Sequence, residues 1–138
     1  MTVAVVTDRN GVPLGFAADA ADVSEVWLAE PAVMAVEVWV PSGTPLLADK
    51  GYDSDDLRDT LAGHGFELLA RHRKNRTRAS RNDGRKLRRL RRRWRVERSN
   101  AWLKTYRRAG VRYERYPQLH EGFLSLACAF IALNSLLK

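Results

Sequence analysis

The sequence predicts an α/β fold, in which a mixed sheet is flanked by helices. Short apolar and β-branched runs bounded by turn residues indicate strands, and segments with helix-capping residues or a helical period alternate with them. The chain has 138 residues, of which 45% are hydrophobic, so it suits one domain with a core of its own.

The first 18 residues predict a β-hairpin. Residues 2–6 are β-branched and apolar, and residues 12–18 are read as the returning strand. Between them stands Asp8-Arg9-Asn10-Gly11, in which Asn-Gly readily adopts the positive φ angles of a tight turn.

A helix is predicted after the hairpin, because Asp22 and Glu25 stand three residues apart as in a capping box. We expect this helix to reach about Val36, unless Pro31 breaks it. Trp27 and Trp39 are expected in the core.

The middle of the chain predicts a strand that ends in an acidic residue. Pro45–Ala48 is a short apolar run, read as a buried strand, and Asp49 closes it. Ser54 is placed to cap a helix over residues 55–62, whose first turn carries acidic residues as the helix dipole favours. A second short strand is predicted over residues 66–70.

The last part of the chain predicts a loop and two helices. Residues 71–84 are polar and basic without a period, which indicates a flexible loop. A long basic helix follows over residues 85–107, and an amphipathic C-terminal helix starts near Pro117. Its predicted core face recurs at alternating spacings of four and three residues, as Leu119, Phe123, Leu126, Phe130, Leu133 and Leu137.

Positive charge is concentrated in one segment. Residues 71–115 hold 20 Lys and Arg against 3 Asp and Glu, whereas the rest of the chain holds 4 against 13, and the whole carries a formal net charge of +8. Such a field attracts a polyanion, so nucleic acid is the predicted partner, with the loop over residues 71–84 lying on it. A solvated, partly disordered basic segment is the alternative.

The composition argues against several other classes of protein. One cysteine, Cys128, rules out an internal disulfide, and its apolar neighbours indicate a small buried hydrophobe rather than a reactive thiol. No Cys/His spacing suggests zinc, and the three histidines show no ligand spacing. The apolar run over residues 123–137 is expected to be too short and too interrupted for a membrane span, and no signal peptide is evident, so an intracellular protein is expected.

One acidic residue in the basic helix needs an explanation. On a helical wheel Glu97 falls at the edge of the apolar stripe that should face the core, with Arg93 and Lys104 beside it. An Arg93–Glu97 ion pair four residues apart is the simplest explanation, and such exposed pairs contribute only about 0.3–0.5 kcal/mol. The stripe consists of Leu87, Leu90, Trp94 and Ala101.

A second explanation pairs Glu97 with Asp49. A carboxylate at the end of a strand and one at the edge of a core helix can converge on a divalent cation, and Mg²⁺ needs few protein carboxylates because it keeps several waters. Two such ions about 3.5–4 Å apart can activate a nucleophile and stabilise the leaving oxygen of a phosphodiester. The surrounding Arg and Lys side chains would hold DNA phosphates.

Two motifs resemble those of bacterial insertion-sequence transposases of the DDE class. Residues 47–54, LADKGYDS, are similar to the second-aspartate motif of that family, and residues 97–104, ERSNAWLK, are similar to its glutamate motif. The glutamate motif spaces Tyr, Arg, Glu and Lys with two, three and six residues between them. Here Arg93, Glu97 and Lys104 match it, and Leu90 stands at the Tyr position.

The likeness covers nearly the whole chain, from the hairpin at residues 8–15 to the basic stretch at residues 106–115. It implies a partial ribonuclease H-like fold and DNA transposition by metal-dependent strand cleavage and strand transfer at insertion-sequence ends. Asp49 and Glu97 would be the second and third catalytic acids and would bind Mg²⁺ or Mn²⁺. The DNA-binding side chains would be Arg93 and Lys104 near the cut, together with Arg89, Arg92, Arg107 and Arg108.

The family's first aspartate lies on a strand that precedes the hairpin. Asp8 lies in the hairpin turn and Asp22 is explained as a helix cap, so neither replaces it. We therefore expect residues 1–138 to be a single truncated catalytic domain that lacks the first strand and is incomplete or inactive alone. The exposed sheet edge favours pairing with another chain. The expected partners are double-stranded DNA and a second copy or an N-terminal fragment, at the bacterial nucleoid in the cytoplasm.

Two other hypotheses for the function stay open. A non-catalytic DNA-binding remnant of a transposase would keep the basic helix without the chemistry. A structural RNA-binding protein would use the arginine-rich stretch but leaves Asp49 unexplained.

Three further side chains near the motifs have predicted roles, and two of them have an alternative role. Trp94 is expected in the core, whereas Trp102 either packs against the last helix or offers a platform for an unstacked base. Asp53 is read as the entry to the helix that follows it, with a supporting role near Asp49 as the alternative.

Overall fold

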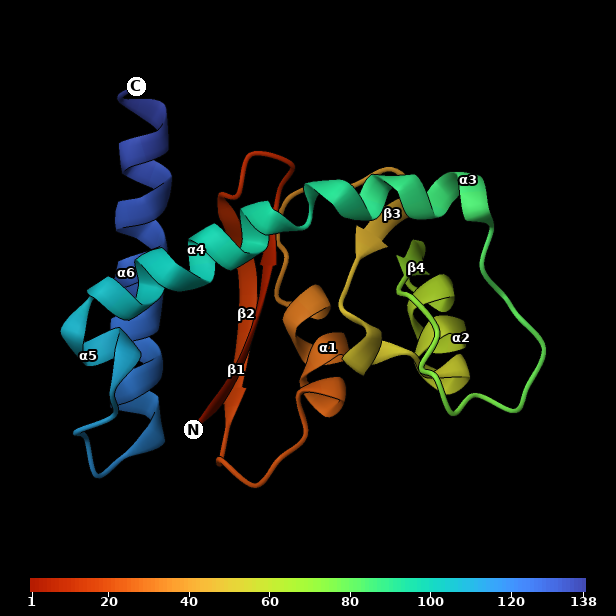
Figure 1. The fold of residues 1–138 in the computed structure, drawn as a ribbon. Helices are drawn as coiled ribbons and strands as arrows, with labels where there is room; N and C mark the ends of the chain where they lie inside the picture. The colour runs from red at the N-terminus through yellow and green to blue at the C-terminus, as the bar shows by residue number, and fades with distance from the viewer. The chain divides into compact units, whose positions relative to one another are not determined.

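The computed structural model describes all residues, 1–138, and the chain divides into two compact units (Figure 1). The first unit combines residues 1–37 with residues 94–138, and the second unit is residues 38–93. Each unit contains a two-stranded sheet accompanied by helices, which confirms the mixed α/β class. The strands form one antiparallel pair and one parallel pair in separate sheets.

An antiparallel hairpin lies at the centre of the first unit. Strand β1 (Thr2–Thr7) pairs with β2 (Pro13–Asp19). In the turn, the Asp8 carboxylate accepts hydrogen bonds from the backbone N–H groups of Asn10 and Val12, at 2.7 and 2.9 Å. Gly11 has a φ of 86°, which glycine adopts without a steric penalty. The predicted hairpin is confirmed, with its second strand one residue later than expected.

Helices cover both faces of this hairpin, because successive side chains of a strand point to opposite faces. On one face, Ala4 packs with Leu28 and Ala32 of helix α1 (Glu25–Met34). The other face packs on α4 (Trp94–Thr105), α5 (Arg107–Gly110) and α6 (Pro117–Leu136). The strand residues in this second cluster are Val3, Val5, Phe16 and Ala18.

Helix α1 differs from its prediction at its start. Its N-cap is Ser24 rather than Asp22, and no side chain makes a capping hydrogen bond. The helix continues through Pro31 to Met34, since burial of its small residues stabilises it despite the lost backbone donor. The core prediction for Trp27 and Trp39 is wrong, because both side chains are largely exposed.

Helix α6 begins at Pro117 as predicted but buries a different face. The buried residues are His120, Leu124, Ala127 and Ile131. Of the predicted core face, Phe123 is half-buried and the other five residues are exposed. The helix is apolar on most sides, so apolar periodicity alone could not decide which stripe packs. The stripe that contains Ala127 allows a closer approach to the hairpin.

By length and composition alone, α6 could cross a membrane, contrary to the expectation that this run is too short. It has 20 residues, and its most apolar window has a mean hydropathy of 1.4. Core helices of globular proteins pass the same test, and Leu124, Ala127 and Ile131 of α6 lie in the core of the first unit.

The predicted long basic helix is divided into shorter pieces. Helix α3 (Gly84–Leu87) is followed by a 3₁₀ segment, η2 (Arg88–Arg92), before α4 begins at Trp94. Four of the five residues of η2 are arginines, and like charges three or four residues apart disfavour α-helical turns. The predicted core stripe is also wrong for α4, because Trp94 and Ala101 are exposed whereas Ser99 and Leu103 are buried.

The second unit is built on a parallel strand pair with a helical crossover. Strand β3 (Thr44–Leu47) pairs with β4 (Phe66–Leu69), with Thr44 opposite Phe66, and α2 (Asp55–Gly63) joins them. All four residues of β3 are half-buried rather than buried as predicted. The Ser54 hydroxyl accepts a hydrogen bond from the Leu57 N–H at 3.3 Å, which confirms the predicted cap of α2. The core of this unit consists of Leu57, Leu61, Leu68, Leu69 and Ala70.

Candidate active site and nucleic-acid interface

Asp49 follows the carboxyl end of β3 and begins the single turn η1 (Lys50–Tyr52). Its carboxylate accepts a hydrogen bond from the Lys50 N–H at 2.7 Å, which caps this turn. The Arg93 Nη1 atom lies 3.2 Å from the same Asp49 oxygen, and the Asp49 side chain is 56% exposed. The carboxylate is therefore accessible to a cation, and Arg93 partly offsets its negative charge.

Glu97 lies in the first turn of α4 and is exposed. Contacts to the hairpin turn hold this helix: the fully buried Ser99 hydroxyl donates to the Gly11 carbonyl oxygen, and Arg98 Nη2 donates to the Asn10 carbonyl oxygen at 2.7 Å. A Cβ atom at Gly11 would lie 2.9 Å from the Ser99 hydroxyl oxygen, so only glycine fits this contact. The hairpin turn thus fixes the helix that carries Glu97.

Asp49 and Glu97 belong to different units of the chain, so their convergence on one cation stays a prediction. No group of three or more His, Cys, Asp or Glu side chains is arranged to hold a metal ion. The oxygen donors of both predicted residues nevertheless have the hard-ligand chemistry that Mg²⁺ and Mn²⁺ prefer.

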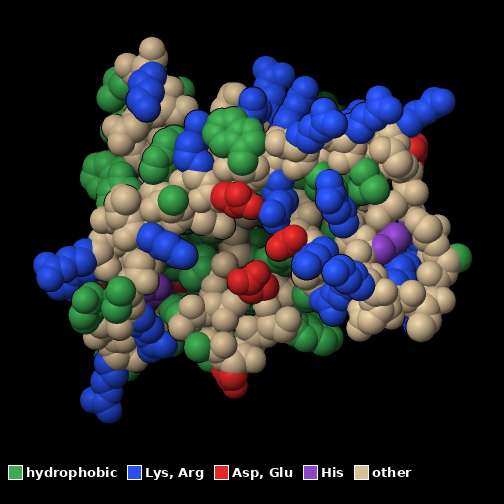
Figure 2. Space-filling view, in the orientation of Figure 1, with side chains coloured by type: hydrophobic (Ala, Val, Ile, Leu, Met, Phe, Trp, Pro, Cys, Tyr) green, Lys and Arg blue, Asp and Glu red, His purple; other side chains and the backbone are tan.

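The predicted DNA-binding side chains are mostly at the surface. Arg89 and Arg92 of η2 are exposed, as are Lys104 at the end of α4 and Arg107 of α5. Arg108 is exposed too, but its guanidinium pairs with Glu114 at 2.8 Å and lies over the Phe123 ring. Exposed Lys and Arg side chains can be seen in Figure 2. Such side chains suit phosphate contacts.

Asp53 is the buried centre of an ion-pair network that the sequence did not reveal. Its side chain is 2% exposed and lies 2.8 Å from Arg58 Nη2 and 2.9 Å from His72 Nδ1. The backbone N–H of Arg73 donates to its second oxygen at 2.9 Å, and Arg76 Nη1 lies 3.4 Å away. Asp53 is therefore more than the entry to α2, because it ties that helix to the loop after β4.

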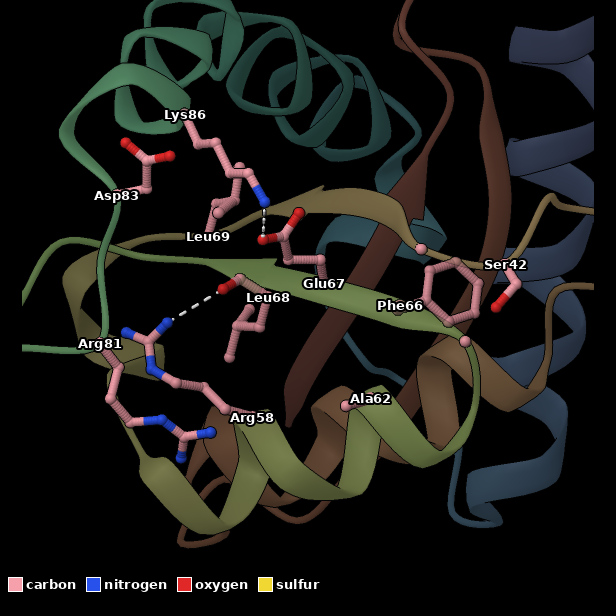
Figure 3. A pocket seen from close by; sticks show the side chains of 12 residues that line it. Ser42, Arg58, Ala62, Phe66, Glu67, Leu68, Leu69, Arg81, Asp83 and Lys86 are labelled. Carbon is pink, nitrogen blue, oxygen red and sulfur yellow. Dashed lines mark hydrogen bonds and ion pairs between the residues drawn. The ribbon is translucent and has the colours of Figure 1, made fainter.

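Arg58 is the buried cation of this network and pairs with Asp53. Its side chain is 6% exposed and donates to the carbonyl oxygen of Leu68 at 2.9 Å (Figure 3). It also donates to the carbonyl oxygen of Ala70 at 3.1 Å. It thereby supplies donors to backbone groups at the end of β4. The pairing of a buried arginine with a buried aspartate avoids an uncompensated charge in the interior.

The same network reaches the turn that follows Asp49. The Arg73 side chain donates to the carbonyl oxygens of Lys50, at 3.3 Å, and of Gly51. Because the Arg73 backbone is itself bound to Asp53, the loop after β4 and the turn after β3 are fixed together. This arrangement agrees with the predicted alternative that Asp53 supports Asp49.

Asp53 has a strongly perturbed pKa. Burial alone would raise it, but hydrogen bonds from the Arg58 side chain, the Arg73 backbone and His72 outweigh that effect and lower the pKa from 3.8 to about 2. A lowered pKa means that the folded state binds the proton less readily than the unfolded chain does. Ionised Asp53 therefore stabilises the fold above pH 3.8, and this contribution is lost as the pH falls towards 2.

We expect the unfolding free energy of the Asp53→Asn variant to fall less at acidic pH than that of the wild type. The shift of the Asp53 pKa corresponds to about 2 kcal/mol at neutral pH. The difference in unfolding free energy between wild type and variant should therefore shrink by about this amount from pH 6 to pH 2. Urea unfolding at several pH values measures it, and parallel curves for the two proteins would contradict the assignment.

A cavity of about 470 Å³ lies beside β4 and α2, but it is not part of the predicted site. Its lining includes Phe66, Arg81 and the ion pair between Lys86 and Glu67, whose charged atoms are 2.6 Å apart (Figure 3). None of the predicted catalytic or DNA-binding residues lines it.

The predictions for four other side chains have different outcomes. His72 is hydrogen-bonded to Asp53 and to Ser80. Cys128 is half-buried against the core of the first unit, and burial raises the pKa of its thiol to about 11, as expected for an unreactive side chain. Trp102 packs against the same core, whereas Trp94 is 51% exposed, contrary to its core prediction.

Comparison with known proteins settles the family. The family described as "Transposase DDE domain" matches residues 1–132 of the chain. The chain belongs to this transposase family. The DDE transposase chain is also 36% identical, over 139 aligned positions, to a protein of Burkholderia cepacia described as "Putative transposase for insertion sequence element IS402".

That alignment covers 96% of this chain and 62% of the relative, so the chain spans about three-fifths of the length of the curated relative it matches. No solved structure matches. The comparisons confirm the predicted family, whereas the roles of Asp49, Glu97 and the basic side chains rest on the motifs and the geometry.

The residues that sequence reasoning missed are Arg58, Arg73 and Arg76. Each looked like one more solvated cation in a basic chain. The only signal in the sequence was the group of acidic residues at positions 53–59, which is close enough along the chain to offer several partners to the basic loop. Which cation meets which acid depended on the βαβ geometry.

Proposed function

We propose that residues 1–138 act as a DNA transposase catalytic domain, which cleaves and joins DNA strands at the ends of an insertion sequence. The observation that carries this proposal is the position of Asp49, directly after the carboxyl end of a parallel strand in a βαβ unit. In open α/β sheets, ligands bind outside the carboxyl ends of the strands. The family match to transposase DDE domains gives this position its chemistry.

The order of elements supports a partial ribonuclease H-like fold. An antiparallel hairpin is followed by a helix and then by a parallel strand pair with its own crossover helix, before the helix that carries Glu97. We propose that the two sheets belong to one such domain. Its open strand edges would pair with a second copy or with an N-terminal segment.

Asp49 and Glu97 would supply carboxylate oxygens to Mg²⁺ or Mn²⁺. When bound, such an ion polarises a phosphodiester and lowers the pKa of an attacking water or hydroxyl. Arg93 pairs with the Asp49 carboxylate at 3.2 Å and would help to position it. Lys104 and the exposed arginines 89, 92, 107 and 108 would bind phosphates and keep the DNA backbone near the acids.

The proposed substrate is double-stranded DNA, at the insertion-sequence ends and at the target. Exposed Lys and Arg side chains neutralise DNA phosphates and release counterions, so binding should weaken steeply with salt. A protein acting on the chromosome would work in the bacterial cytoplasm, at the nucleoid.

The test is a cleavage assay on the native locus. We expect the protein expressed from its intact locus to introduce strand breaks at the ends of the flanking element in Mg²⁺ or Mn²⁺, and none in excess chelator. End-labelled DNA from that locus, resolved on sequencing gels, locates the breaks. Metal-independent breaks, or breaks scattered without relation to the element ends, would refute the proposal.

A non-catalytic DNA-binding remnant is the second candidate. It is supported by the exposed Lys and Arg side chains, which would bind phosphates whether or not the acids hold a metal ion. The same assay separates the two functions, because a remnant would retain salt-dependent binding to the DNA without breaking it.

A further inference from the structure

The basic loop between β4 and α3 is held against α2 by a set of cations that pair with acids on or just before that helix. Arg76 Nη2 lies 3.0 and 3.1 Å from the two carboxylate oxygens of Asp55, and Arg81 Nη2 lies 2.7 Å from Asp59. Arg73 and Arg76 also bind Asp53. These contacts involve three acids on or just before one short helix, so they fix the loop at several points along its length.

Hydrogen bonds within the loop and to β4 add to this order. The Arg76 Nη2 atom donates to the Ala79 carbonyl oxygen at 2.7 Å, and the Arg81 N–H donates to His72 Nε2 at 3.1 Å. The Asn82 side-chain amide donates to the Ala70 carbonyl oxygen at 2.9 Å. A loop that the sequence predicted to be flexible is therefore extensively bonded.

Other cations of the same loop face outward. Arg71 and Lys74 are exposed. The Arg78 side chain is 73% exposed, and its nearest acid, Asp55, is 3.6 Å away. Asp53, Asp55 and Asp59 already have inward partners, so the outward charges are not neutralised to the same degree. The loop thus has one set of cations that pair with nearby acids and fix its shape, and a second set that presents positive charge to solvent.

We propose that residues 71–83 form a preordered phosphate-binding loop, held by Asp53, Asp55 and Asp59 and contacting the DNA backbone through Arg71, Lys74 and Arg78. This inference rests on the proposed function, because it takes DNA as the partner. Ordering the loop in advance lowers the entropy lost when its long side chains become immobile on phosphates.

The Asp53→Asn substitution tests the preordering, because the two explanations predict opposite changes in DNA affinity. The substitution removes one negative charge, so simple electrostatics predicts tighter DNA binding. If the loop must be ordered, the variant binds duplex DNA about tenfold more weakly, because its cations lose their fixed positions. The affinity of the 138-residue chain for a 20-base-pair duplex can be measured by fluorescence anisotropy at several salt concentrations.

Asp56→Asn is the matched control, since Asp56 is an exposed acid of α2 that also loses one negative charge. It should bind the duplex as tightly as wild type or more tightly. Circular dichroism would verify that both variants are folded, and limited trypsin digestion would report whether the loop arginines become accessible in Asp53→Asn alone. Equal or tighter binding by folded Asp53→Asn would overturn the preordering.

The outward cations are tested separately. Substituting Lys74 leaves the contacts of the network described above unchanged, and substituting Arg78 removes only its 3.6 Å contact to Asp55, which Arg76 still binds at 3.0 Å. Each of Lys74→Ala and Arg78→Ala should reduce the slope of log affinity against log salt by about 0.9, the value for one lost phosphate contact. Unchanged slopes in both variants would overturn the assigned contacts. If the wild-type chain bound no duplex at low salt, the proposed function itself would fail, a result distinct from either outcome above.

Discussion

Transposition from the native locus should fall at least about a hundredfold when Asp49 is replaced by asparagine, since even loss of a residue that only supports a metal ligand costs about 10–100-fold. Asparagine keeps the size of the side chain and can still accept the Lys50 N–H hydrogen bond that caps η1. It removes the negative charge that would hold a divalent cation. The expected loss is therefore chemical rather than structural.

The measurement compares transposition frequency and DNA binding in the same variants. Asp49→Asn and Glu97→Gln should both lose transposition while their affinity for duplex DNA stays within about threefold of wild type, because neither substitution removes a phosphate-binding cation. Asp56→Asn, an exposed acid of similar chemistry, should transpose normally. Undiminished transposition by Asp49→Asn would remove this residue from the catalytic site.

The ion pair between Arg93 and Asp49 adds a distinct expectation for DNA binding. Asp49→Asn removes the negative charge that lies 3.2 Å from the Arg93 guanidinium, so that variant should bind duplex slightly more tightly than wild type at low salt. The difference should vanish in high salt, where surface charges are screened.

The Arg58→Ala variant should lose about 3–5 kcal/mol of unfolding free energy, the range for breaking a buried ion pair by removing one partner. Asp53, 2% exposed, would keep its charge but lose its closest buried cation. The Leu68 and Ala70 carbonyl oxygens would lose donors in the interior at the same time. Each of these groups was desolvated on folding, so its unmet hydrogen bond opposes folding.

Denaturant unfolding of single and double variants would measure this effect. Arg78→Ala is the control, because an exposed arginine should change stability by only about 0.5 kcal/mol or less. Combining Arg58→Met with Asp53→Asn should recover part of the loss, since no buried charge is then left without a partner. A loss below about 1 kcal/mol for Arg58→Ala would show that the network contributes little to folding.

The elements whose local signals are strong were predicted well. Asn10-Gly11 and the flanking β-branched residues gave the hairpin, and Ser54 with its acidic successors gave the start of α2. The strand before Asp49 was found because a short apolar run ends there, although it is only half-buried. These features depend on neighbouring residues, which is why a sequence reading can reach them.

Local sequence patterns could not predict which faces of α4 and α6 are buried. In α6, apolar residues surround most of the helix, and the hairpin selected the stripe with Ala127. In α4, Ser99 looked like a solvent-facing residue until its hydroxyl met the Gly11 carbonyl oxygen, 88 residues away in the chain. A polar residue is buried when a distant partner satisfies it, and no local pattern reports that partner.

The sequence by itself determined the family, the strand–acid–turn arrangement around Asp49 and the concentration of positive charge in residues 71–115. These depend on residue identity and short spacings. Only the tertiary structure decided which cations pair with acids of the chain and which face solvent. Arg58, Arg73 and Arg76 differ from Arg71 and Lys74 not in chemistry but in the acids that the βαβ unit brings near them.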